Sequence, residues 1–264
     1  MRNCAPRLAF AALALPSLLA LGGCGSGSGE APVACTHHLV YVSAADTHEK
    51  LVALTFDDGP GPYAQELFDV LRSHHVPGTF FMVGERVAKH LEEHKAGLLH
   101  EIMAAGMEIG NHSYDHPRDL PDEGEGASLQ LEITNREIFR ASGFEPCLFR
   151  PPYGNVSPEL IQRAKVLGMT TVKWDVDPAD WTHPGAAVIR ERVLADVGPG
   201  SIVDMHDNAE TRGQTAEALP GIIEGLKARG YRFLTVTQLL GDAFITGTTS
   251  ASTSSATERA LGPE

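Results

Sequence analysis

Residues 51–60 read LVALTFDDGP, an apolar run of strand type that ends in two adjacent carboxylates and a Gly-Pro pair. On a regular strand, successive side chains point to opposite faces, and neighbouring like charges repel each other. The pairing of Asp57 with Asp58 therefore needs a reason. Taken alone, the stretch also fits a solvated turn, in which Asp, Gly and Pro are common. The rest of the chain decides between the two interpretations.

Short apolar runs alternate with amphipathic helical patterns between about residue 36 and residue 243. We predict strands at Leu51–Phe56, Gly78–Val83, Glu108–His112, Cys147–Arg150, Thr170–Asp175, Ser201–His206 and Arg232–Val236. We predict helices at Tyr63–His74, Glu85–Ala105, Ala127–Ser142, Ser157–Leu167, Ala186–Val197 and Thr215–Arg229. This alternation implies an α/β fold with parallel strands and right-handed crossovers, arranged as a doubly wound sheet or as a barrel.

Polar clusters follow five of these seven predicted strands. In chain order they are DD at 57–58, NHSYDHP at 111–117, RPPYG at 150–154, DVDPADW at 175–181 and MHD at 205–207. In a parallel barrel, the carboxyl ends of the strands meet at one rim, where catalytic groups gather. Five clusters at corresponding strand ends favour a functional site over a set of unrelated turns.

Two histidines in the second cluster, His112 and His116, suggest a metal site. Pro117 argues against a helix here, so we place the pair on a loop. Two imidazoles and one carboxylate, with a fourth position left for water, are the usual ligands of a catalytic zinc ion. Either Asp57 or Asp58 could supply the carboxylate oxygen. The other would then be free to take a proton from water, which explains why the two acids are adjacent.

The motifs TFDDGP, HSYDH, RPPYG, DPADW and MHD, in this order, resemble those of the polysaccharide deacetylase family. This family is also called the NodB-homology or carbohydrate esterase 4 family. The resemblance spans roughly residues 40–243 and implies a distorted (β/α)7 barrel. It also implies metal-dependent hydrolysis of acetyl groups from N-acetylglucosamine polymers, or from acetylated xylan in some members.

From this resemblance we expect an enzyme that removes N-acetyl groups from an acetylated glycan, either peptidoglycan or a chitin-like oligosaccharide. We expect Zn²⁺ as its metal and a monomer as the acting form. Two alternatives stay open. The protein could be an O-acetyl esterase acting on acetylated xylan, or a non-catalytic glycan-binding protein that uses the same barrel.

The resemblance also implies roles for the first three motifs. Asp58, His112 and His116 would hold the metal, and Asp57 would be the general base. Arg150 would keep Asp57 ionised and oriented.

The two later motifs and Tyr153 of RPPYG would supply the remaining catalytic groups. His206 would be the general acid that protonates the leaving amine. Either Asp177 or Asp180 would orient it. The backbone N–H of Tyr153 would face the oxyanion of the tetrahedral intermediate.

The chain departs from the family pattern at the acetyl pocket. The family has L-x-H before the late histidine, with the leucine lining the pocket, whereas this chain reads Asp204-Met205-His206. We expect Asp204, Trp181 and Pro152 at the substrate pocket. An acid in place of an apolar wall changes the polarity of that pocket and leaves the metal site untouched.

Composition limits the partners. The chain has 264 residues, of which 42% are hydrophobic and 21% charged, as in ordinary globular proteins. Its formal net charge of −13 argues against nucleic acid or an anionic membrane surface as the main partner.

The first residues have the pattern of a targeting segment. Arg2 and Arg7 precede an apolar run over residues 8–21 that is too short to span a bilayer comfortably. The following LGGC at 21–24 resembles a bacterial lipobox. We predict a signal peptide of lipoprotein type over 1–23, a lipidated Cys24 that attaches the protein to an extracytoplasmic membrane face, and a flexible tether over 24–35. A cleaved secretory signal without lipid is the alternative.

Two further features complete the domain organisation. Residues 36–243 would form the deacetylase domain, and residues 244–264 a disordered Ser/Thr-rich tail. Outside the cytoplasm, Cys35 and Cys147 could form a disulfide, although two free thiols are also compatible with the sequence.

Overall fold

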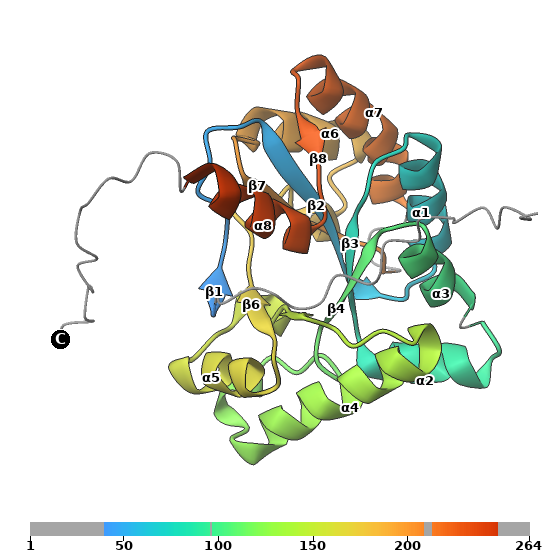
Figure 1. Cartoon of the computed structure of the whole chain (residues 1–264). Coiled ribbons are helices and arrows are strands. Elements are labelled where there is room, and N and C mark those ends of the chain that lie inside the picture. The colour runs from blue at the N-terminus through green and yellow to red at the C-terminus, as the bar shows by residue number, and fades with distance from the viewer. Residues whose placement is uncertain (1–39, 96, 209–212, 248–264) are drawn as a thin grey trace, which may run out of the picture. The chain divides into compact units, whose positions relative to one another are not determined.

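The computed structural model describes residues 40–95, 97–208 and 213–247, and a parallel sheet forms its centre (Figure 1). The strands are β1 (Tyr41–Val42), β2 (Leu51–Gly59), β3 (Thr79–Met82), β4 (Glu108–Asn111), β5 (Leu148–Phe149), β6 (Thr170–Val172), β7 (Ser201–His206) and β8 (Arg232–Phe233). Their order is β1-β6-β5-β4-β3-β2-β7, and β8 also pairs with β2. All pairings between the strands described are parallel.

The segment after β6 returns to β7 and closes the curled sheet. Val176 forms a parallel bridge with Val203, and the backbone N–H of Asp204 donates to the Val176 carbonyl over 2.9 Å. The predicted distorted (β/α)7 barrel is thereby confirmed. The short strand β1, which pairs with β6, was not predicted from the sequence.

The central strand β2 explains why LVALTFDDGP determines the fold. All of its nine residues are buried, as expected of a parallel strand covered on both faces. Phe56 stacks on Phe80 of β3 with ring centroids 5.0 Å apart, a contact typically worth about 0.5–1.5 kcal/mol beyond simple burial. The apolar part of the stretch thus packs in the core, and the two acids that follow it lie at the rim formed by the carboxyl ends of the strands.

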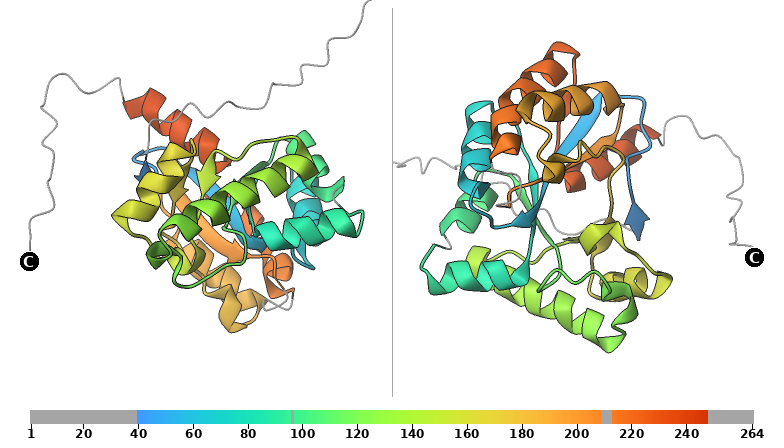
Figure 2. Two further views of the ribbon diagram at one scale, coloured as in Figure 1. Left: turned by 90° about the horizontal axis from the view of Figure 1, so that it is seen from below. Right: turned by 180° about the vertical axis from the view of Figure 1, so that it is seen from behind.

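Helices surround the strands (Figures 1 and 2). They are α1 (Ala64–Ser73), α2 (Gly84–Glu92), α3 (Gly97–Ala104), α4 (Glu125–Ser142), α5 (Pro158–Val166), α6 (Ala186–Asp196), α7 (Gln214–Ala228) and α8 (Val236–Gly247), with short 3₁₀ turns η1 (Leu120–Asp122), η2 (Pro152–Gly154) and η3 (Asp180–Thr182). Helix α8 was not predicted from the sequence.

The prediction of one helix over Glu85–Ala105 is wrong, because two helices, α2 and α3, occupy this stretch. Helix α2 ends where His94 adopts a left-handed backbone conformation with φ of 57°. A left-handed residue just past the last turn is a common way to end a helix, and the Lys95 N–H then donates to the His90 carbonyl over 2.8 Å.

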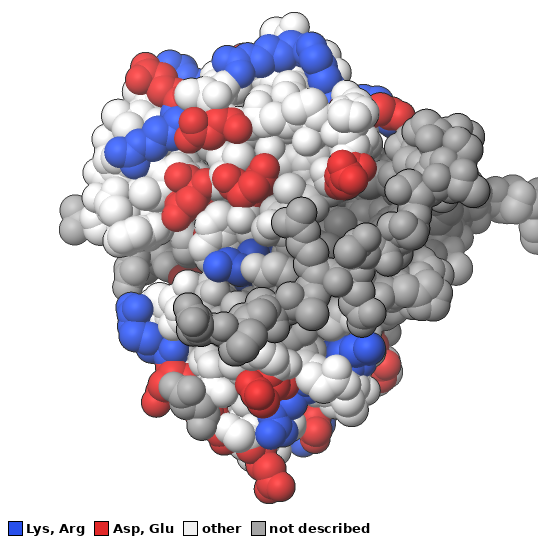
Figure 3. All heavy atoms as spheres, turned by 90° about the vertical axis from the view of Figure 1, so that its left-hand side faces the viewer, with Lys and Arg blue, Asp and Glu red and all other residues white. Residues whose placement is uncertain are grey.

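The described residues belong to one compact unit. The predicted signal peptide, the tether with Cys24 and Cys35, and most of the predicted tail lie outside the described residues. Cys147 is disulfide-bonded. Among the helices described, none has the length and apolar character needed to cross a membrane. On the face drawn in Figure 3, acidic and basic side chains are interspersed.

Candidate active site

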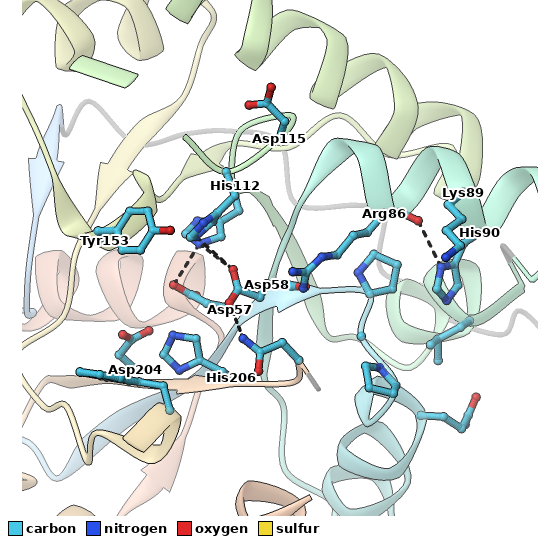
Figure 4. Close-up of a pocket in the computed structure, with 18 of the residues that line it drawn as sticks. Asp57, Asp58, Arg86, Lys89, His90, His112, Asp115, Tyr153, Asp204 and His206 are labelled. Atoms are coloured by element: carbon cyan, nitrogen blue, oxygen red, sulfur yellow. Dashed lines mark hydrogen bonds and ion pairs between the residues drawn. The ribbon is translucent and has the colours of Figure 1, made fainter. Parts of the chain in front are cut away.

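The carboxyl ends of four strands bring the predicted residues together around one cavity (Figure 4). Asp57 is the register partner of His206 across β2 and β7. His112 directly follows β4, and Arg150 directly follows β5. The polar clusters of the sequence therefore form a single centre.

An irregularity in β2 brings both acids to the same site. The pairing with β3 shifts register between Phe56 and Gly59, so that β2 has one more residue than its partner, as in a β-bulge. Asp58 lies inside this bulge with φ of 70°, an uncommon conformation for a residue with a side chain. As a result, His112 Nε2 lies 3.6 Å from Asp57 Oδ2 and also 3.6 Å from Asp58 Oδ1.

Asp58, His112 and His116 converge as a possible metal site. Asp58 Oδ1 lies 3.1 Å from His116 Nε2, and the three donor atoms lie within 4.8 Å of one another. Asp58 Oδ1 is buried and has no hydrogen-bond partner among the described residues. A buried carboxylate oxygen without a donor is costly unless something else compensates its charge.

Neighbouring groups orient the donor atoms towards this point. His112 Nδ1 lies 2.7 Å from the Arg150 carbonyl oxygen, which can only accept, so Nδ1 carries the proton and Nε2 presents its lone pair. Asn208 Nδ2 donates to Asp58 Oδ2 over 2.6 Å and leaves Oδ1 facing the imidazoles. This arrangement resembles the supporting contacts that fix metal ligands in proteins, so the residues present fit a divalent cation.

The charge states also suit metal binding. Burial, and then the neighbouring His112, lower the pKa of His116 to about 4, so its imidazole is neutral at neutral pH. Burial acts to raise the pKa of Asp58, but the nearby imidazoles and Arg86 outweigh this effect and lower it below its ordinary value. Neutral imidazole and ionised carboxylate are the forms that bind metals.

Arg150 holds the carboxylate of Asp57 in place within the barrel. Its side chain is fully buried, and Nη1 donates to Asp57 Oδ1 over 2.8 Å, to Thr55 Oγ1 over 2.6 Å and to Asp204 Oδ1 over 3.0 Å. Asp204 therefore shares the guanidinium with Asp57. Burial, and then the charge of Asp57, raise the pKa of Asp204 well above its ordinary value.

His206 is oriented by Asp180. Its Nδ1 lies 2.8 Å from Asp180 Oδ1, and its backbone N–H donates to Asp180 Oδ2 over 2.8 Å. Burial acts to lower the pKa of His206, but the hydrogen bond that its ring donates to Asp180 and the charges of Asp204 and Asp57 raise it well above its ordinary value. The sequence left Asp177 and Asp180 as alternatives. Asp177 instead accepts the Ala179 N–H over 2.7 Å.

The cavity around this centre has a volume of about 1580 Å³. Tyr153, Trp181, Asp177 and Asp204 line it, whereas Pro152 is buried and is not among the described residues that do so. Trp181 is 51% exposed and Tyr153 is 48% exposed, so both present aromatic surface at the opening. The ring of Tyr153 also packs against His116, with centroids 4.7 Å apart.

Three residues near the centre were not singled out from the sequence. Asn208 and Asp207 directly follow His206, and Asp207 Oδ2 accepts the Gly61 N–H over 3.2 Å, which fastens the loop after Asp58. Burial raises the pKa of Asp207 to about 7. An available signal was that Asp207 is the last residue of the MHD motif and Asn208 follows it directly. Arg86 Nη1 donates to the Asp58 carbonyl from α2, a contact that no sequence pattern indicates.

Comparisons with known proteins agree with this architecture. The polysaccharide deacetylase family model matches residues 44–172. A peptidoglycan-N-acetylglucosamine deacetylase of Bacillus cereus is 38% identical over 196 residues, covering 73% of this chain and 89% of the relative. A crystal structure of a peptidoglycan N-acetylglucosamine deacetylase matches with a TM-score of 0.72 at 32% identity, covering 77% of this chain and 94% of that chain.

A pseudoenzyme of the carbohydrate esterase 4 family from Bacillus anthracis has the same fold. It matches with a TM-score of 0.69 at 33% identity, covering 76% of this chain and 68% of that chain. Together, the barrel, its polar rim and these matches define a glycan-modifying hydrolase of the α/β-barrel class. The chain belongs to the polysaccharide deacetylase family.

Proposed function

We propose that this protein removes N-acetyl groups from a glycan of the cell envelope that contains N-acetylglucosamine, using a divalent metal ion. The observation that carries the proposal is the convergence of the Asp58, His112 and His116 donor atoms within 4.8 Å, next to a carboxylate and an imidazole that can exchange protons. Zn²⁺ is the ion that two imidazoles and one carboxylate suit best.

Asp58, His112 and His116 would hold the ion. A cation bound there would supply Lewis acidity, which polarises the acetyl carbonyl and makes water a stronger nucleophile at neutral pH.

Asp57 would be the general base. Its Oδ1 is fixed by Arg150 over 2.8 Å, which leaves Oδ2 on the side of His112. From this position Asp57 would accept a proton as water attacks the acetyl carbon. General-base catalysis typically contributes about a hundred- to ten-thousand-fold in rate.

His206 would be the general acid. The raised pKa keeps its imidazole protonated near neutral pH, and Asp180 fixes the ring through Nδ1, so Nε2–H is free to donate. His206 would protonate the amine as the carbon–nitrogen bond breaks, which yields acetate and a free amino sugar. The Tyr153 N–H would donate to the oxyanion that forms in between.

The relatives support the choice of substrate. The relative from Bacillus cereus is named a deacetylase of peptidoglycan N-acetylglucosamine, and other relatives are named chitooligosaccharide deacetylases. The O-acetyl esterase alternative uses the same chemistry. The similarity to a pseudoenzyme makes the non-catalytic alternative worth testing, although Asp57, Asp58, His112, His116 and His206 are all present in this chain.

The relatives that are named peptidoglycan deacetylases support a location outside the cytoplasm, where peptidoglycan lies. We infer that Cys24 carries the membrane anchor. One acyl chain alone binds membranes only marginally, so stable attachment requires the several chains of a bacterial lipoprotein. Native protein should sediment with membranes, and a Cys24→Ala variant should not. Sedimentation of both proteins with membranes would refute the anchor and leave the proposed activity intact.

One experiment separates the three functions. Purified protein with measured metal content is incubated with chitooligosaccharides, peptidoglycan glycan strands and acetylated xylan, and released acetate is quantified. Acetate from the first two substrates, abolished by a chelator and restored by Zn²⁺, is the expected result. Acetate from xylan alone would support the esterase. Binding without acetate release from any substrate would support the non-catalytic protein.

A further inference from the structure

One face of helix α2 carries positive charge into the cavity. Arg86, Lys89 and His90 are three and four residues apart, which places them on the same side of a helix, and all three line the cavity (Figure 4). Glu85 and Glu92 of the same helix are not among the described lining residues. Lys89 is three residues beyond Arg86, a rise of about 4.5 Å along the helix axis, so the basic face extends away from the metal ligands.

Lys89 is available to a ligand. It is exposed, and its side-chain ammonium has no hydrogen bond or ion pair within the described part of the chain. Glu93 also lines the cavity from this end of α2, but its carboxylate is paired with Lys95 over 2.7 Å. Arg86, in contrast, is engaged with the Asp58 carbonyl and has a structural role beside the metal ligands.

Acidic side chains occupy other parts of the cavity wall. Asp177 lies near the exposed Trp181, and Asp115 accepts a hydrogen bond from Gln130 over 2.7 Å. Arg118 also lines the cavity, with its guanidinium 3.8 Å from the centre of the Tyr153 ring, so basic side chains lie both there and on α2. The chain as a whole carries −13, which would repel a negatively charged polymer. A basic surface inside a cleft can offset this repulsion, because low-dielectric walls concentrate its field.

We propose that the α2 face, with Lys89 at its centre and His90 beside it, is a subsite for carboxylate groups of an anionic glycan. This deepens the proposed function, on which it rests for the polymer that occupies the cavity. In peptidoglycan, carboxylates come from the lactyl ether of N-acetylmuramic acid and from the peptide stems. Either would lie on the α2 side while the acetyl group of a neighbouring sugar reaches the metal ligands.

The test compares Lys89→Gln and Lys89→Glu with the wild type on three substrates: neutral chitooligosaccharides, peptide-free glycan strands, and the same strands with their peptides. Lys165→Gln and Lys165→Glu are the matched controls, because Lys165 is an exposed lysine on α5 outside the described cavity lining. Both binding affinity and acetate release are measured, so failure of the deacetylase activity would not prevent a decision on the subsite.

Lys89→Gln should weaken binding of the anionic strands by about 1.4- to 5-fold, the range of exposed ion pairs, and raise KM by the same factor. Lys89→Glu should weaken it further, and kcat should not change. The binding affinity, KM and kcat for the neutral substrate should not change. Raising the salt concentration from about 0.01 M to about 1 M shortens the Debye length from about 30 Å to about 3 Å, which should remove the difference.

The substrates also identify the source of the carboxylate. An effect on both kinds of strand indicates the lactyl group, and an effect only on strands with peptides indicates the stems. Equal effects on neutral and anionic substrates, or equal effects of the Lys89 and Lys165 substitutions, would overturn the proposal. Absence of acetate release together with charge-dependent binding would contradict the deacetylase function and support the subsite.

Discussion

The contact between Asp180 and His206 allows a quantitative prediction for Asp180→Asn. This change removes the negative charge from the group 2.8 Å from His206 Nδ1 and preserves the shape of the side chain. A hydrogen bond to a charged group is worth about 1.5–3 kcal/mol. At about 1.36 kcal/mol per pKa unit, its loss lowers the pKa of His206 by about one to two units.

The sign of the effect follows from the role of His206 as an acid. Only the protonated imidazole can donate to the leaving amine, so its pKa sets the alkaline limb of the pH dependence of kcat/KM. The limb should move to lower pH by about one to two units in Asp180→Asn. Metal content should stay at the wild-type level, because Asp180 is not among the described residues of the donor cluster.

Folding stability gives an independent measurement of the same pKa. The pKa of His206 is higher in the folded state than in the unfolded state, where it is 6.5. The contribution of His206 to the free energy of unfolding is therefore complete below pH 6.5 and is lost as the pH rises through the pKa of the folded state. The unfolding free energy of the wild type should therefore fall over this alkaline range, and that of Asp180→Asn should fall less.

Asp177→Asn is the matched control, because it removes the same charge from the cavity wall without touching His206. Its alkaline limb should stay near that of the wild type. An unmoved alkaline limb in a folded, metal-loaded Asp180→Asn enzyme, or equal movement in both variants, would show that Asp180 does not raise the pKa of His206.

Three further predictions concern two residues beside the site and a buried acid at the opposite end of β4. Asn208→Ala should weaken metal binding, measured by calorimetry, about 10- to 100-fold, because the substitution frees the Asp58 side chain to rotate. An unchanged metal affinity would show that Asn208 does not position Asp58. Asp204→Leu should preserve metal binding. It should also move the alkaline limb to lower pH by less than Asp180→Asn does, because Asp204 contacts Arg150 rather than His206. If only the preference among acetylated substrates changed, Asp204 would be a residue that shapes the pocket. Burial raises the pKa of Glu108 above its ordinary value of 4.5. The contribution of Glu108 to the free energy of unfolding is therefore lost as the pH rises from 4.5 through the pKa of the folded state. Thermal unfolding of Glu108→Gln should depend less on pH in this range.

The sequence predicted the part of the fold that buried strands determine. Strand β7 is found at Ser201–His206 as predicted, and β2 begins at Leu51 as predicted, because parallel strands covered on both faces are rich in apolar residues such as Ile202, Val203 and Met205. The break between α2 and α3 was not predictable from periodicity, since the amphipathic pattern continues across it. It depends on the left-handed backbone at His94.

For the candidate site, sequence order indicated which residues meet but not which atoms do. Strand ends of a parallel barrel share a rim, which was sufficient to group Asp57 with His206. The choice of Asp180 over Asp177 depends on the path of a loop, and the shared use of Arg150 by two acids depends on side-chain positions across the barrel. Such contacts between distant segments have no local signature.

The two adjacent acids, Asp57 and Asp58, have different tasks in the proposed reaction, and a comparison of two matched variants separates these tasks. Asp57→Asn and Asp58→Asn are purified under the same conditions, and bound metal and acetate release are measured on each preparation. Asp57→Asn should retain wild-type metal content and lose about a hundred- to ten-thousand-fold in kcat, whereas Asp58→Asn should lose metal as well as activity. Near-normal turnover by Asp57→Asn, or loss of metal from it equal to that of Asp58→Asn, would contradict this division of roles.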